Sequence, residues 1–221
     1  MMIYRASMRN NPFIGVYVAS GGGSAIVPPA APRGFVSRLE GLLGLDVGLT
    51  TVGGVSAVGA MAVMNKNGIA VPSIISDEEL SALRALGRRI GVVESKHNCL
   101  GNLVCTNDYG AVASPALPKE AIAPLRDVLG VEIRQLTIAG SEVVGSVVVA
   151  TNGGALTHPF ISEGEKDEVR RSLNVKVDAG TVNGGFKHVR AGIILGLEGI
   201  LVGEATTGPE LMLIREALSL A

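Results

Sequence analysis

A short motif, an apolar residue followed by glycine, recurs at nearly constant intervals along the chain. The separations between successive glycines are 44, 42, 44 and 47 residues. A fixed period of this length indicates a protein built from repeated supersecondary units, and it constrains the fold more than composition does. The five occurrences are Ile14-Gly15, Val58-Gly59, Leu100-Gly101, Val144-Gly145 and Ala191-Gly192.

The same order of local patterns follows each glycine. A short apolar run predicts a strand, and the asparagine- and glycine-rich turn after it suits a hairpin because both residues tolerate positive φ. A second apolar run then ends near a proline, which cannot donate to a sheet. The first runs, predicted as strands, are Val16–Ala19, Met61–Met64, Leu103–Cys105, Val147–Ala150 and Ile193–Leu195.

A helix and a last strand complete each predicted unit. Capping-box patterns predict helix starts in three units, at Ser76, Ser162 and Thr207. The residues placed to end helices are Gly44, Gly87, Gly130 and Asn174. The last strands are predicted at Val47–Val52, Ile90–Val93, Val131–Ile138 and Val175–Val177.

The fifth unit lacks its last strand, whereas Ile3–Ser7 forms an extra strand before the first unit. The simplest prediction is that this N-terminal strand completes the fifth unit and closes the array into a ring. We therefore predict an α+β fold, a single cyclic domain over residues 1–221 with five strand-strand-helix-strand repeats of about 44 residues. The repeats are expected at 13–57, 58–99, 100–143, 144–190, and 191–221 together with 1–12. A closed ring leaves no free sheet edge, so we expect a monomer.

Composition excludes several classes of function. With 19 Lys and Arg against 20 Asp and Glu, the chain has no basic excess to neutralise a nucleic-acid backbone, and aromatic residues are only 3%. No apolar run reaches the ~18 residues of a membrane span. Two cysteines are too few for a disulfide scaffold, so a cytoplasmic location without membrane contact is expected.

Motifs for catalysis, cofactors or metals are missing from the sequence. Gly21-Gly22-Gly23 is not followed by the lysine of a phosphate-binding loop, and no His-Glu-x-x-His or paired Cys-x-x-Cys pattern occurs. Cys105 falls on an apolar strand and is predicted in the core, whereas Cys99, near His97, is a weak candidate for an activated thiol. We expect no enzyme activity, no cofactor and no metal.

Equivalent loops of a ring gather on one face. The loops before the repeated glycines carry polar, mostly uncharged groups, which suits a protein-binding face with direct hydrogen bonds. These loops are Met8–Phe13, Gly53–Ala57, Lys96–Cys99, Ile138–Val143 and Asn183–Arg190.

Several segments resemble the translation initiation factor 6 family, in particular its archaeal members, over essentially the whole chain. They include Leu100-Gly101-Asn102, Thr106-Asn107-Asp108-Tyr109 and Ala179-Gly180-Thr181-Val182-Asn183. The resemblance implies a pentein-type ring, also called an α/β propeller. It implies a factor that binds the large ribosomal subunit, prevents premature joining of the small subunit and acts in late subunit maturation. The implied partner is mainly a ribosomal protein near the sarcin–ricin loop.

The same resemblance implies part of a contact face. That face includes Leu100, Gly101 and Asn102, and the matching position of the neighbouring unit is Ala60, where eukaryotic members often carry arginine. An alanine makes no charged contact, so the interface is expected to differ there. By symmetry we extend the predicted ribosome-binding set to Asn10, Asn11, Ser56, Asn98 and Asn183.

Two other functions are kept as alternatives. The pentein architecture also holds guanidino-modifying enzymes with a cysteine nucleophile, and fold alone does not decide function. Neither cysteine lies near the C-terminal end, where those enzymes carry it. An RNA-binding ribosomal protein is the other alternative, and it predicts a steep loss of affinity with salt.

Overall fold

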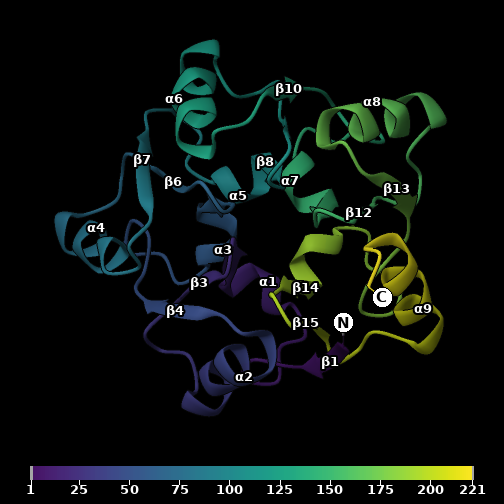
Figure 1. Cartoon of the computed structure of the whole chain (residues 1–221), viewed down its shortest axis with the longest axis horizontal. Helices are drawn as coiled ribbons and strands as arrows, with labels where there is room; N and C mark the ends of the chain where they lie inside the picture. The colour runs from purple at the N-terminus through teal and green to yellow at the C-terminus, as the bar shows by residue number, and fades with distance from the viewer. Residues whose placement is uncertain (1, 221) are drawn as a thin grey trace.

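The computed structural model describes residues 2–220, and within that range five three-stranded sheets surround a central axis (Figure 1). We number the five units by the order of their sheets in the chain. In every sheet the middle strand pairs antiparallel with one neighbour and parallel with the other. The sheets are β2 (Ala19–Gly21), β3 (Ser24–Val27), β4 (Asp46–Leu49); β5 (Val63–Met64), β6 (Gly68–Pro72), β7 (Arg89–Val93); β8 (Val104–Thr106), β9 (Ala111–Ala113), β10 (Ile133–Gln135); β11 (Val148–Ala150), β12 (Gly154–Thr157), β13 (Lys176–Ala179); and β14 (Ile193–Leu195), β15 (Gly199–Gly203), β1 (Met2–Ala6).

One longer helix per unit lies on the outside of the ring (Figure 1). The predicted capping boxes at Ser76, Ser162 and Thr207 are all formed, so the sequence signal for these helix starts is confirmed. Each helix turns buried residues toward its sheet, and Leu125 of the third unit is an example. The helices are α2 (Arg33–Leu43), α4 (Asp77–Arg84), α6 (Lys119–Leu129), α8 (Glu163–Leu173) and α9 (Gly208–Ala217).

The N-terminal strand closes the ring. β1 pairs in parallel with β15, with Met2 opposite Gly199 and Ala6 opposite Gly203. The predicted pentein-type ring of strand-strand-helix-strand units, closed by the N-terminal strand, is confirmed. The two chain ends lie close together as a result (Figure 1).

Four of the five predicted first strands begin too early, whereas Ile193–Leu195 is confirmed as β14. A single helical turn precedes the first strand in every unit, so Val16 and Met61, predicted in strands, lie in helical turns instead. An apolar run of four residues has no period that separates a helical turn from a strand, and the sequence alone did not reveal these turns. They are α1 (Ile14–Tyr17), α3 (Val58–Met61), α5 (Leu100–Leu103), α7 (Val144–Val147) and the 3-10 turn η1 (Val189–Gly192).

The repeated glycines allow these turns to pack around the axis. A Cβ added to Gly59 would lie 2.0 Å from the carbonyl oxygen of Gly15, and one on Gly101 would lie 2.1 Å from that of Gly59. A Cβ on Gly145 would be 2.4 Å from the Gly101 oxygen. The glycine of each turn therefore packs against the backbone of the preceding unit. The regular spacing of these glycines in the sequence arises because the units need a glycine at this contact.

The fifth glycine of the predicted motif was misplaced. Because η1 starts at Val189 as α7 starts at Val144, the residue equivalent to Gly145 is Arg190, not Gly192. The loop before η1 is one residue longer than that before α7, so Arg190 follows Gly145 by 45 residues, and the counted spacing of 47 includes two further residues to Gly192. Arg190 thus stands where the other four units have glycine, and its turn is 3-10 rather than α-helical.

Side chains of the hairpin turns tie each unit to the next. The Asn65 side-chain amide donates to the carbonyl oxygens of Asn107, at 3.1 Å, and of Leu129, at 2.9 Å. The Asn107 amide repeats this one unit further, to Thr151 at 3.1 Å and Leu173 at 2.8 Å. These asparagines, predicted only as turn formers, also hold the last carbonyls of the next unit's helix.

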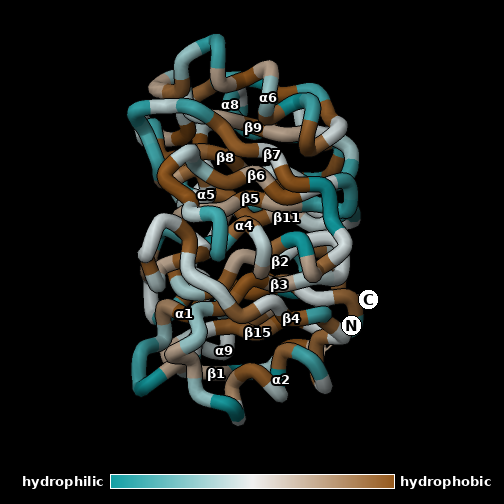
Figure 2. Tube along the Cα trace, turned by 90° about the vertical axis from the view of Figure 1, so that its left-hand side faces the viewer, coloured by the Kyte–Doolittle hydropathy of each residue, from teal (hydrophilic) through white to brown (hydrophobic). Residues whose placement is uncertain are grey.

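The ring is a disc with two distinct sides. We call the side of the loops that enter the one-turn helices (residues 7–13, 50–57, 94–99, 136–143 and 180–188) the loop face. The opposite side, with the five hairpin turns and both chain ends, is the hairpin face. Figure 2 shows α1 and α5 toward one side, the termini toward the other and hydrophobic residues between them. No helix of residues 2–220 is long and apolar enough to cross a membrane.

Candidate functional site

Four of the five loops on the loop face share one compact geometry. A pair of backbone hydrogen bonds closes each of them at an isolated bridge, and the turn inside uses left-handed backbone. Glycine accepts this backbone readily, and asparagine tolerates it. The bridges join Met8 to Asn11, Val52 to Val55, Ile138 to Ser141 and Val182 to Phe186.

Three glutamates fix these turns in place. The Glu79 carboxylate accepts hydrogen bonds from the backbone N–H groups of Gly53 and Gly54, both at 2.8 Å. Glu210 accepts from Gly184 at 3.0 Å and Gly185 at 2.8 Å, and Glu165 accepts from Ala139 at 2.8 Å. The same glutamates form the capping boxes, so one residue both starts a helix and shapes the loop face.

These hydrogen bonds determine the charge of the Glu210 carboxylate. Burial by itself raises its pKa, but the bonds from Thr207, Thr181 and the two glycines outweigh burial and lower the pKa to about 2. Hydrogen bonds from neutral donors to a carboxylate favour the ionised form in this way. The loop is therefore held by a charge throughout the physiological range.

The third loop, residues 94–99, departs from this geometry. Within residues 2–220 it forms no bridge of the kind found in the other four loops. The helix that would anchor it is α6, whose third residue is Ala121 rather than glutamate. A short turn remains, in which the Ser95 hydroxyl accepts from the His97 N–H at 3.0 Å. The symmetry of the loop face is thus broken just before α5, the turn that contains the predicted contact residues.

The structure divides the Leu100-Gly101-Asn102 motif into two roles. Leu100 is fully buried in the core of the third unit, and Gly101 is buried against Gly59. Both residues are predicted in the contact face; since they are buried, they position the turn, and their place in the interface stays a prediction. Asn102 is half-buried, and its side-chain amide makes no hydrogen bond to residues 2–220. It can therefore offer both donor and acceptor to a partner.

Ala60 occupies the position of Asn102 in the neighbouring α3 turn and is half-buried. The equivalent residues form a ring around the axis on the loop face, and most have small side chains. Asn102 is the one amide in this ring of Val16, Ala60, Asn102, Ser146 and Ala191. The centre of the loop face accordingly has mostly small side chains, with Asn102 and Ser146 as its polar ones.

The other predicted residues lie on the loop face but differ in availability. Asn10 and Ser56 are exposed, whereas the side-chain oxygen of Asn98 is buried and has no hydrogen-bond partner among the described residues. Asn11 is used internally, since its side chain accepts from the Phe13 N–H at 2.8 Å. The Asn183 side chain is also occupied by an internal hydrogen bond, because its amide donates to the Pro12 carbonyl oxygen at 2.9 Å. This bond joins the fifth unit to the first.

Sequence reasoning missed an aromatic cluster on the loop face. The rings of Phe13 and Phe186 are 4.7 Å apart, and the Lys187 ammonium lies 4.4 Å above the Phe160 ring. Phe160 is 68% exposed and Phe186 is 38% exposed. No sequence signal marks this cluster, because its three phenylalanines, Phe13, Phe160 and Phe186, come from separate parts of the chain. Exposed aromatic groups of this kind are enriched at protein interfaces.

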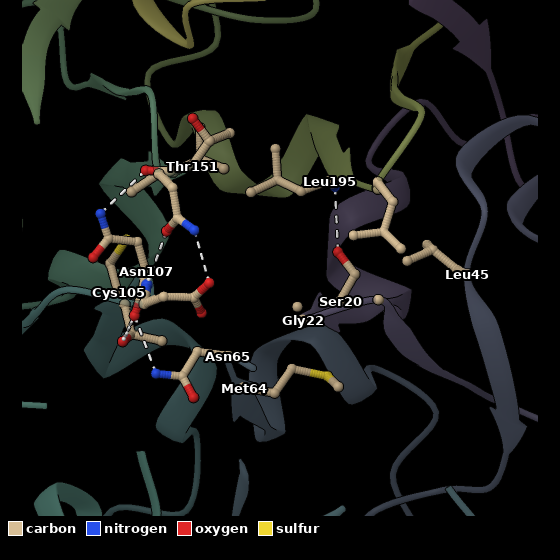
Figure 3. A pocket seen from close by; sticks show the side chains of 18 of the residues that line it. Ser20, Gly22, Leu45, Met64, Asn65, Cys105, Asn107, Thr151 and Leu195 are labelled. Carbon is tan, nitrogen blue, oxygen red and sulfur yellow. Dashed lines mark hydrogen bonds between the residues drawn. The ribbon is translucent and has the colours of Figure 1, made fainter. Parts of the chain in front are cut away.

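The hairpin face contains a cavity of about 260 Å³ at the ring axis (Figure 3). Its walls include Cys105, whose pKa is raised by burial to about 12, so the thiol stays protonated at neutral pH. No histidine is among the lining residues described, and Arg190 places a positive charge there. A guanidinium substrate would be repelled by that charge, which speaks against the guanidino-modifying alternative.

Cys99 is exposed, and its sulfur lies 3.9 Å from that of Met61. Among the described residues, no group of three His, Cys, Asp or Glu side chains forms a metal site.

Comparison with known proteins gives a consistent result. A family model described as the eIF-6 family matches residues 3–217. Translation initiation factor 6 of Methanocaldococcus jannaschii is 37% identical over 99% of this chain and 99% of its own. Translation initiation factor 6 of Staphylothermus marinus is 35% identical over 99% of this chain and 98% of its own. The eukaryotic factor of Saccharomyces cerevisiae is 34% identical over 99% of this chain and 91% of its own.

A solved structure shows the same fold in another protein. A dimethylarginine dimethylaminohydrolase in an adduct with S-methyl-L-thiocitrulline has a TM-score of 0.52 at 15% identity, over 80% of this chain and 69% of that one. At this identity the likeness shows the shared pentein fold alone.

Proposed function

The chain belongs to the eIF-6 family, and from this premise we propose that it binds the large ribosomal subunit through its loop face and blocks premature joining of the small subunit. The relatives are named as translation initiation factors, and we propose that this chain acts in initiation and in late large-subunit maturation. The proposed action is steric, without catalysis or a cofactor.

The observation that carries the choice of face is the broken symmetry of the third unit. Four loops are closed by internal hydrogen bonds, whereas the loop of residues 94–99 is not. Beside it, the half-buried Asn102 side chain offers donor and acceptor groups that no described residue satisfies, and the buried side-chain oxygen of Asn98 is also unpaired. Unsatisfied polar groups on an otherwise self-contained surface are expected where a partner supplies the hydrogen bonds.

The aromatic cluster adds a second contact region to the proposed interface. Phe160 and Phe186 lie in units four and five, across the loop face from Asn102. An interface that spans both regions has apolar anchors at one side and hydrogen bonds at the other, which fits a protein partner. We propose a ribosomal protein near the sarcin–ricin loop as the main contact. Formal net charge is only −1, which agrees with a contact that depends little on phosphates.

Cosedimentation in sucrose gradients tests the proposal. Purified archaeal large subunits are mixed with the protein, with and without an equimolar amount of small subunits. We expect the protein to travel with the large subunit and the joined particle to decrease. If the protein stays at the top of the gradient and subunits join normally, the proposed function is wrong for this chain.

A matched pair of variants tests the choice of face. Phe160→Ala removes an exposed ring on the loop face, and Tyr109→Ala removes an exposed ring on the hairpin face. We expect only the first to weaken cosedimentation. The reverse result would place the interface on the hairpin face.

A further inference from the structure

The cavity on the hairpin face contains a cation that the symmetry of the ring does not require. Arg190 takes the place of the inner glycine of the other units. Its side chain crosses the ring, and its Nη2 donates to the carbonyl oxygen of Gly59 in the α3 turn at 3.3 Å. This is the one hydrogen bond that the guanidinium makes to residues 2–220, so most of its N–H donors are left without a protein acceptor.

Arg190 also lacks a charge partner. None of the ion pairs among the described residues includes it. Asp108 lines the same cavity, but its carboxylate is engaged by the Lys66 N–H at 3.0 Å and by the Asn152 amide at 2.7 Å. Burial of the guanidinium lowers its pKa, and Cys105 beside it is a protonated thiol. Arg190 is half-buried, and a guanidinium that lines a cavity without a carboxylate partner is available to bind an anion there.

The rest of the cavity suits a small anion with an apolar part. Ser20 lies beside Leu195 on one wall, opposite Cys105 and Asn107 (Figure 3). The Ser20 hydroxyl accepts from the Leu195 N–H at 3.2 Å, and its own proton remains available. Leu45, Met64 and Leu197 supply apolar surface. The volume of about 260 Å³ exceeds the ~150 Å³ of cavities that admit a benzene ring.

We propose that the axial cavity binds a small oxyanion, a carboxylate or phosphate, with the Arg190 guanidinium as its principal ligand and the Ser20 hydroxyl as a second donor. A guanidinium matches two oxygens of such an anion in a bidentate pair, a geometry that chloride cannot provide. The ligand enters from the hairpin face, opposite the proposed ribosome-binding face. The site is therefore independent of the proposed function.

Thermal unfolding and isothermal titration calorimetry test this site. Wild-type protein is titrated with sodium phosphate, acetate or citrate, and with sodium chloride at equal ionic strength. We expect a saturable rise in Tm with at least one oxyanion and none with chloride, because a ligand that binds only the folded state stabilises it. The phosphate arm and the two carboxylate arms identify which oxyanion the site prefers.

Variants separate specific binding from a general salt effect. Arg190→Met is expected to weaken oxyanion binding by roughly tenfold or more, as for the loss of a charge-assisted hydrogen-bond donor. Arg126→Met, which removes an exposed arginine of α6, is the charge-matched control and should bind like the wild type. If Arg190→Met fails to fold, Arg190→Lys keeps the charge without the planar fork and should bind with intermediate strength. Equal Tm responses to oxyanion and chloride, or equal responses of the Arg190 and Arg126 variants, would overturn the proposal.

Discussion

At the scale of single residues, the repeated motif combines two different requirements. Its glycine is needed because a side chain would collide with the backbone of the preceding unit, as at Gly101 and Gly59. The residue after the glycine faces the loop side and is free to vary, and there Asn102 stands alone among small side chains. The position of the glycine is set by packing, and that of the asparagine by function in our proposal.

Asn102→Ala should weaken binding to the large subunit without lowering stability. The side chain makes no hydrogen bond within the described residues, so the loss is expected only in the complex and amounts to about 1 kcal/mol. Cosedimentation at limiting protein measures the affinity, and thermal unfolding measures the stability. Asn152→Ala on the hairpin face is the control for affinity alone, because its side chain, unlike that of Asn102, is bonded to Asp108. Unchanged affinity in Asn102→Ala would remove this residue from the interface.

Gly101→Ala should destabilise the protein by about 1–3 kcal/mol, because its Cβ would lie 2.1 Å from the Gly59 oxygen. Gly41→Ala, in the exposed last turn of α2, meets nothing within 4 Å and should instead stabilise the protein by about 0.5–1 kcal/mol. Urea unfolding of both variants measures these effects. The same sign for both changes would contradict the packing role of the inner glycine.

At the scale of elements, the helix starts and the loop face depend on each other. Glu79, Glu165 and Glu210 each cap a helix and also hold a loop that follows the preceding sheet. In α6 the position of the capping glutamate is taken by Ala121, and the loop of residues 94–99 forms no closing bridge among the described residues. A capping box thus accompanies three of the four closed loops, whereas the loop of residues 7–13 is closed although α2 has Phe35 in place of the glutamate.

Glu210→Gln should lower the free energy of unfolding by about 2 kcal/mol at neutral pH. The loss should be smaller near pH 2, where the wild-type carboxylate becomes protonated. The folded pKa of about 2 lies below the ordinary value, so the ionised group stabilises the fold above about pH 4.3. This contribution is lost as pH falls through 2. Unfolding free energies measured from pH 7 to pH 2 test the prediction, with the exposed Glu216→Gln on the same helix as control. A pH-independent difference between wild type and Glu210→Gln would contradict it.

At the scale of the whole molecule, the ring joins chain ends that are far apart in sequence. β1 supplies the outer strand of the fifth sheet, and the Asn183 amide, bonded to Pro12, ties the fifth unit to the first. The fifth sheet thereby gains a third strand, as in the other four units, and β15 becomes its middle strand rather than an edge. Closure therefore explains why the fifth unit takes its last strand from the N-terminus.

Removal of residues 1–7 should open the ring at β15. We expect a lower Tm and association of the protein at high concentration, because β15 then presents an unpaired edge. Size-exclusion chromatography with light scattering measures the association, and calorimetry measures the Tm. A synthetic peptide of residues 1–7 should restore the Tm, whereas a peptide of scrambled sequence should not. A truncated protein as stable and monomeric as the full chain would show that β1 is dispensable.

The salt dependence of ribosome binding distinguishes a protein contact from an RNA contact. We expect the logarithm of the affinity to fall with that of salt concentration at a slope of magnitude below about 3, since each phosphate contact adds roughly 0.7 to 0.9. The measurement is cosedimentation over a series of potassium chloride concentrations. A slope several times steeper would favour the RNA-binding alternative.

The sequence by itself determined the features that arise from local chemistry. The period of the glycines, the capping boxes and the turn residues predicted five units, their helices and the closure by Ile3–Ser7, because each rests on neighbouring residues or on simple repetition. Only the tertiary structure decided the features that depend on contacts between units. It placed one-turn helices at the axis, Arg190 in the register of a glycine, and Leu100 in the core while Asn102 stayed accessible. It also gathered Phe13, Phe160 and Phe186 on one face. Packing around a closed ring brings these residues together across most of the chain, and such contacts leave no local pattern.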